Sequence, residues 1–185
     1  MKIVKILCLA LPLALLVSEP AAAHTDEYTS MEQKHVIHMS KRAIVAFKKT
    51  DPKLARFFEN SAGYAVFPKV TKGAVGIGGA GGRGTLFEKN HHPVGLAHLS
   101  QVTIGVALGG QTFREIIFFE TKADMDNFKY GGVKMSADAS AVAAAEGAAS
   151  HAAYRNGVAI FTLPIGGLMF EASVGGQSFR FEPLP

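Results

Sequence analysis

The sequence predicts an α+β fold in which an amino-terminal helical hairpin packs on a bent, glycine-rich antiparallel sheet or flattened barrel. Residues 25–60 have helical periodicity, whereas residues 63–185 alternate apolar and polar positions and are interrupted by glycine. The 185 residues are 48% apolar and include 20 glycines, which excludes a disordered chain and is sufficient for one packed domain. Bending or closure of the sheet would account for so many strand glycines.

The first 23 residues are typical of a cleaved secretory signal peptide. Lys2 and Lys5 precede an apolar run over residues 6–17, and residues 18–23 end in a small-x-small pattern. About twelve apolar residues are too few to cross a hydrocarbon core of about 30 Å. Cys8 is too close to the start for a lipid-attachment site and would leave with the signal. We therefore expect an exported protein, periplasmic or envelope-associated, with one domain over residues 24–185.

Residues 25–49 predict a helix with one cationic and one apolar face. Asp51 and Pro52 then predict an N-cap and first helical residue of a second short helix through Phe58. Val45 is the one apolar residue on the wrong side. The cationic arc comprises Lys34, His38, Lys41, Arg42, Lys48 and Lys49, and the apolar arc comprises Val36, Met39, Ala43, Ile44 and Phe47.

The remaining chain predicts short strands separated by glycine-containing turns. Thr121 and Asp124 form a capping-box pattern, which predicts a helix over residues 122–130. The alanine-rich residues 135–153 favour a helix by propensity alone. The strands are expected at residues 64–67, 74–79, 85–88, 99–108, 112–119, 158–163, 168–174 and 178–181.

Two patterns within these strands make sharper predictions. Val102, Ile104, Val106 and Leu108 alternate with small or polar residues, which predicts that the apolar face is buried. Residues 108–114 also recur as residues 174–180, each copy containing Gly-Gly-Gln-Ser/Thr-Phe-Arg. Gly-Gly suits a tight turn, so each copy is expected to form a β-hairpin.

No catalytic, metal or cofactor site is predicted. Residues 76–81 match a dinucleotide-binding glycine spacing, but a strand rather than a helix is expected to follow, so we interpret them as a glycine-rich strand. His91, His92 and His98 lack nearby ligand-spaced carboxylates or thiols. The chain after residue 23 has no Cys, and no G-x-S-x-G elbow occurs.

Several segments together resemble a known family. They are Asn60-Ser-Ala-Gly-Tyr-Ala-Val-Phe-Pro68, residues 72–80, 82–87 and 105–112, the strand 115–119, residues 137–140 and residues 167–176. In this order they are similar to the SYLF domain family, as an exported bacterial member related to the yeast and animal actin-patch and lipid-binding proteins. The resemblance implies a lipid-binding module without catalytic residues, and a strand over residues 137–145. Phosphoinositide binding is known for eukaryotic members and actin binding for fungal ones, but an exported bacterial protein would meet neither partner.

Charge then indicates where an anionic partner would bind. Residues 24–89 hold eleven Lys and Arg against six Asp and Glu, whereas residues 90–185 hold six against eight. We expect peripheral binding to anionic phospholipid, and neither nucleic acid nor an enzyme substrate. The alternatives are a carrier holding a lipid or other apolar ligand within the sheet, and a structural envelope protein that binds a protein partner. The expected lipid-binding residues are Lys34, Lys41, Arg42, Lys48, Lys49, Lys53 and Arg56, with Lys69, Lys72 and Arg83 ranked second.

Overall fold

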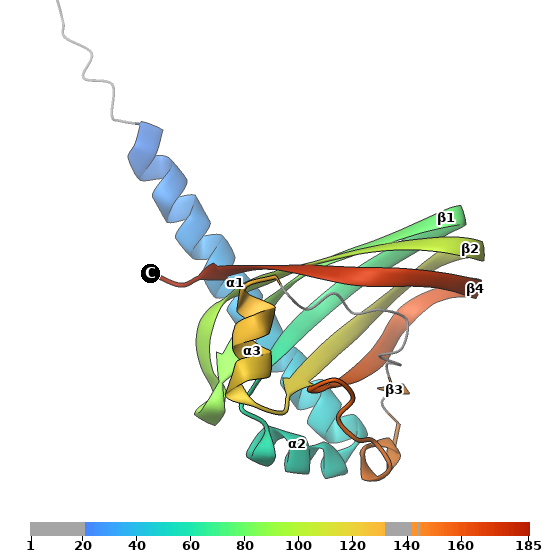
Figure 1. The fold of residues 1–185 in the computed structure, drawn as a ribbon. Helices are drawn as coiled ribbons and strands as arrows, with labels where there is room; N and C mark the ends of the chain where they lie inside the picture. The colour runs from blue at the N-terminus through green and yellow to red at the C-terminus, as the bar shows by residue number, and fades with distance from the viewer. Residues whose placement is uncertain (1–20, 132–141, 144) are drawn as a thin grey trace, which may run out of the picture.

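The protein combines one long helix with a strongly bent sheet (Figure 1). The structure is a computed structural model that describes residues 21–131, 142–143 and 145–185. Most of the predicted signal peptide therefore lies outside the described residues. The elements are α1 (Ala21–Thr50), α2 (Ala55–Asn60), β1 (Gly63–Glu88), β2 (His92–Phe119), α3 (Lys122–Lys129), β3 (Val142–Ala143) and β4 (Val158–Pro183), with short 3-10 turns at Pro52–Leu54, Lys89–His91 and Ala148–Ser150.

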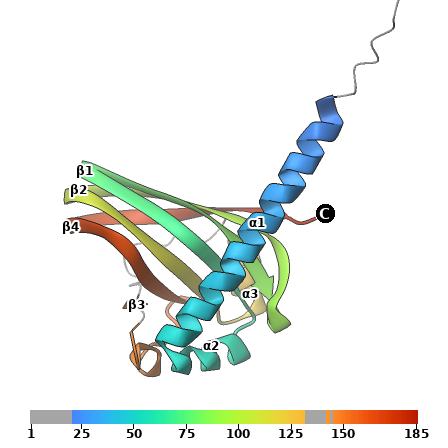
Figure 2. The same cartoon turned by 180° about the vertical axis from the view of Figure 1, so that it is seen from behind.

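The helix α1 crosses one side of the sheet, as its two predicted faces require (Figure 2). Ala43, Ile44 and Phe47 of the apolar arc are buried, and Val45 is exposed as expected. No helix in the described ranges has the length and apolarity needed to cross a bilayer.

The predicted helical hairpin is not confirmed, although helical turns follow Asp51 as expected. Asp51 caps the following turn as expected, because one of its carboxylate oxygens accepts a hydrogen bond from the backbone N–H of Lys53 at 3.0 Å. However, the turn Pro52–Leu54 and the six-residue α2 that follows are too short to form an antiparallel arm along α1. The other carboxylate oxygen of Asp51 accepts from the backbone N–H of Ala149 at 2.7 Å, which ties this corner to the chain before β4.

The sheet is open rather than a flattened barrel. Its strand order is β1-β2-β4-β3, so β1 and β3 are its edges in the described part of the chain. The three long strands pair antiparallel, and the two-residue β3 runs parallel to β4. β3 agrees with the strand implied near residues 137–145, of which residues 137–141 and 144 lie outside the described residues.

Each long strand bends near its middle and returns, so that one strand contributes to two layers (Figure 1). A Cβ added at Gly82 would lie only 2.8 Å from the carbonyl oxygen of Lys69, and one at Gly63 only 2.6 Å from that of Phe87. In both cases the glycine and the nearby carbonyl belong to opposite halves of β1, so the two halves lie against each other. The separate short strands predicted from glycine punctuation are therefore continuous strands, and the predicted bend is present.

Two apolar clusters pack against the sheet. The first lies between α1, α2 and the sheet, where Phe57 and Phe58 pack on Phe118 with ring centroids 5.3 and 4.9 Å apart. The second lies between the two layers of the bent sheet and includes Phe67 and Phe179, whose centroids are 5.8 Å apart. Both clusters lie away from the bend itself.

Candidate functional site

The predicted basic residues are largely presented to solvent, but they do not form one site. Lys34, Lys41, Arg42, Lys48 and Lys49 are exposed along α1, as the helical arc predicted. Of the others, Lys53, Arg56, Lys69 and Arg83 are exposed and Lys72 is buried.

Some of these cations already have partners within the protein. Arg83 forms an ion pair with Glu32 on α1. The ammonium of Lys48 lies 4.4 Å from the centre of the Phe58 ring, a cation–π geometry. Lys48 also lines a hollow of about 580 Å³ at the base of the molecule, together with Lys89 and His91. Lys89 was not among the predicted residues. It lies beside Lys48 because β1 bends near its middle and returns, so that its end comes back to the helices.

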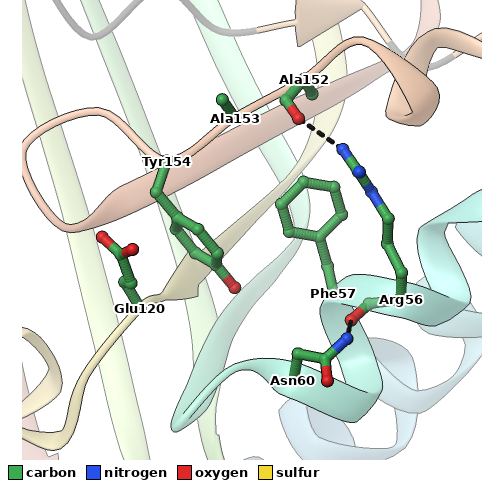
Figure 3. Close-up of a pocket in the computed structure, with 7 residues that line it drawn as sticks. All are labelled: Arg56, Phe57, Asn60, Glu120, Ala152, Ala153 and Tyr154. Atoms are coloured by element: carbon green, nitrogen blue, oxygen red, sulfur yellow. Dashed lines mark hydrogen bonds between the residues drawn. The ribbon is translucent and has the colours of Figure 1, made fainter.

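Arg56 belongs to a second basal pocket of about 410 Å³, shown in Figure 3. Its guanidinium donates to the carbonyl oxygen of Ala152 and lies 4.7 Å from the centre of the Phe57 ring. The hydroxyl of Tyr154 is buried in this region without a partner among the described residues. Burial raises the pKa of Tyr154 to about 12, and Glu120 adds to the shift. The guanidinium of Arg56 is thus already engaged by the backbone of residue 152.

The outer face of the bend is apolar and exposed, contrary to prediction. Val102, Ile104 and Leu108 were expected to be buried, yet their exposed fractions are 63, 65 and 64%. Val75 and Ile77 of β1 are 82 and 71% exposed and pair with Leu108 and Ile104 respectively, so these five side chains share one face of the sheet. The side chain of Val106 lies outside the described set.

The inner face of the bend is polar. Thr103, which lies between two exposed apolar residues, is buried and its hydroxyl has no partner in the described ranges. A pocket of about 200 Å³ opens nearby, with Phe113 and Pro164 on its apolar side. Its polar lining comprises Lys72, Gln101, Gln111, Glu115, Thr162 and Gln177.

Glu115 is the most perturbed group of this pocket. It is buried, and this burial raises the pKa of its carboxyl from the ordinary 4.5 to about 7, against the opposing hydrogen bond from Gln177. The side-chain nitrogen Nε2 of Gln177 donates to Oε2 of Glu115 at 3.2 Å and to Oε1 of Gln101 at 3.3 Å. Oε1 of Glu115 and Oε1 of Gln177 have no partner among the described residues.

The repeated Gly-Gly-Gln motif explains part of this pocket, although not as predicted. Residues 108–114 and 174–180 lie inside continuous strands, so the two predicted hairpins are not formed. Instead, the motifs deliver Gln111 from β2 and Gln177 from β4 to the same pocket.

The histidines have separate surroundings. His91 hydrogen-bonds the hydroxyl of Tyr64, and burial followed by the charge of Lys48 lowers the pKa of His91. Nε2 of His98 lies 3.6 Å from Oε2 of Glu182. In the described part of the chain, no three His, Cys, Asp or Glu side chains gather as a metal site would require. The glycine-rich residues 76–81 lie within β1, as interpreted from the sequence.

Comparison with known proteins finds one distant similarity. No protein-family model matches the chain. The chain is similar to Beta cell expansion factor A from Aeromonas veronii, at 25% identity over 155 residues, which is 83% of this chain and 59% of that protein. A distant homologue thus covers most of the chain, and the chain spans about three-fifths of the homologue's length.

Proposed function

We propose that this protein is a non-enzymatic, SYLF-like phospholipid-binding protein that associates peripherally with anionic membranes of the bacterial envelope. The observation that carries the proposal is the polarity of the bend, which is apolar outside and polar inside. A surface in water normally has the opposite arrangement. A contiguous exposed apolar face is instead typical of a surface that meets a membrane or a partner.

The size of this apolar face is suited to shallow insertion. Full burial of a Val, Leu or Ile side chain contributes about 1.5–3 kcal/mol, so partial insertion of each contributes on the order of 1 kcal/mol. Five such side chains together would offset part of the cost of association.

The basic residues of α1 would add electrostatic attraction. A Lys or Arg near an anionic leaflet contributes about 1 kcal/mol, and this contribution falls with salt. Insertion of apolar side chains does not depend on salt in this way. The two contributions are therefore separable by experiment.

The sequence supports export and lipid binding together. The signal-peptide pattern of residues 1–23 favours a periplasmic or envelope location, and the SYLF resemblance favours lipid over actin as the partner. The basic amino-terminal half favours anionic lipid.

Co-sedimentation with vesicles across a salt series tests the proposal. The vesicles contain phosphatidylcholine with or without phosphatidylglycerol. Ile77→Ser with Ile104→Ser removes part of the apolar face. Tyr130→Ser is the control, because Tyr130 is an exposed large apolar residue at the end of α3, outside both proposed surfaces. Lys41→Gln with Arg42→Gln removes two charges from α1, and Arg155→Gln with Arg180→Gln is the control for the same change in net charge.

We expect the wild type to require phosphatidylglycerol. The isoleucine double variant should bind about ten-fold more weakly at every salt concentration. The α1 charge variant should bind about ten-fold more weakly at low salt only, and both controls should bind like the wild type. Failure of the wild type to bind at low salt would refute the proposal and favour a protein partner or an apolar ligand held in the sheet.

A further inference from the structure

The pocket inside the bend has the polar lining of a ligand site rather than that of an imperfectly packed cavity. A buried carboxyl and several half-buried carboxamides lie together there, and burying polar atoms costs free energy unless they are paired. Yet Oε1 of Glu115 and Oε1 of Gln177 are buried without partners among the described residues. Two copies of one motif, on two different strands, place glutamines at this pocket.

The chemistry of the unpaired atoms defines the missing group. Nε2 of Gln177 is already engaged by Glu115 and Gln101. The two unpaired atoms are an amide oxygen and a carboxyl oxygen, both acceptors when Glu115 is ionised. The complement is a group with several N–H donors, in addition to the ammonium of Lys72 that already lines the pocket. A primary ammonium has three donors, whereas a quaternary ammonium has none.

We propose that this pocket binds a small primary ammonium group, carried either by a free amine or by the headgroup of an aminophospholipid. The pocket volume of about 200 Å³ admits such a group but not an acyl chain. Glu115 and Gln177 supply the two acceptors. This proposal does not depend on the membrane association proposed above, because soluble amines test it directly.

Binding has a consequence for protons. Lys72 is the one other ionisable group among the described residues that line this pocket, and the other polar residues there are neutral. An ammonium beside Glu115 favours the carboxylate and lowers its pKa. Since the pKa of Glu115 is raised to about 7 by burial, binding at pH 7 should release part of a proton.

The test compares two soluble headgroups that differ only in the nitrogen substituents. Glycerophosphoethanolamine carries a primary ammonium, and glycerophosphocholine carries the trimethylated one. Titration calorimetry in two buffers of different ionisation enthalpy gives affinity and proton release, and NMR follows the side-chain amide of Gln177. Glu115→Gln removes the charge while conserving shape, and Glu120→Gln is the control at an exposed carboxylate on the surface.

We expect the ethanolamine compound to bind with proton release and to shift the Gln177 amide signals. The choline compound should not bind, Glu115→Gln should weaken binding at least ten-fold, and Glu120→Gln should leave it unchanged. Equal binding of the two headgroups, or unchanged binding by Glu115→Gln, would overturn the proposal. Melting curves of each variant establish that it is folded.

A second arm distinguishes the source of the amine. Vesicles of phosphatidylcholine with phosphatidylethanolamine, both without net charge, are compared with pure phosphatidylcholine. Binding of both the soluble compound and these vesicles, each dependent on Glu115, assigns the pocket to amines in general. Glu115-dependent binding of the vesicles alone assigns it to the lipid headgroup. Absence of Glu115-dependent binding in both arms refutes the site, whatever the outcome with phosphatidylglycerol.

Discussion

Glu115→Gln should change how the stability of this protein depends on pH. The carboxyl of Glu115 is buried, and its pKa is raised from 4.5 to about 7. Between these two values the native state binds a proton that the unfolded state has lost. Stability therefore falls as pH rises through this window and stays lower above pH 7. The rise of the pKa from 4.5 to about 7 corresponds to about 3 kcal/mol.

The assay is urea unfolding at pH 4, 5.5, 7 and 8.5 for the wild type and for Glu115→Gln. The two proteins should have similar stability at pH 4, where the carboxyl is neutral in the native state and mostly neutral in the unfolded state. At pH 8.5 the variant should be more stable by up to about 3 kcal/mol, because a neutral amide replaces a buried carboxylate. Subtracting the stability of the wild type from that of the variant at each pH cancels the contributions of the other titrating groups. A difference that is constant with pH would show that Glu115 has no raised pKa in the native state.

Three other substitutions test the packing of the fold by urea unfolding. Ser40→Ala removes a buried hydroxyl that donates to the carbonyl oxygen of Val66 at 3.2 Å, so the free energy of unfolding should fall by about 1–2 kcal/mol. An unchanged unfolding midpoint would contradict this link between α1 and β1. Asp51→Ala removes a buried carboxylate that accepts from two backbone N–H groups, so a loss of about 2–3 kcal/mol is expected and a loss below 0.5 kcal/mol would count against it. Gly84→Ala would place a methyl group against the backbone of Val66, so the free energy of unfolding should fall by about 1–3 kcal/mol. In the control Gly73→Ala the added methyl group meets no atom within 4 Å. Equal effects of the two substitutions would argue against close contact between the two halves of β1.

The local elements could be predicted because their signals are local. The α1 periodicity, the Asp51 cap and the capping box at Thr121 each depend on residues within a few positions, and all three are confirmed. Continuity of the strands could not be predicted in this way. Glycine usually marks a turn, but here Gly79 and Gly110 lie within long strands that bend.

The candidate site was predicted only in part for a related reason. Alternation along residues 102–108 distinguishes two faces of a strand, but it does not say which face is inside. Apolar residues are buried in most proteins, so the alternation predicts the wrong face at the bend. The pocket was missed because Glu115, Gln101 and Gln177 come together only through pairing of distant strands. The repeated Gly-Gly-Gln motif was the one sequence signal that could have linked two of its residues.

Because side chains of β1 alternate between the inside and the outside of the bend, the number of residues in this part of the strand matters. Lys72 and Ala74 are buried on the inside, while Val75 and Ile77 are exposed on the outside. Inserting or deleting one residue at this point would exchange the two sets, because the side-chain period of a strand is two. Valine and isoleucine would then face the polar pocket, and a lysine would face outward. Glycine-rich segments at the end of a molecule usually tolerate changes in length, but this one should accept changes of two residues far better than changes of one.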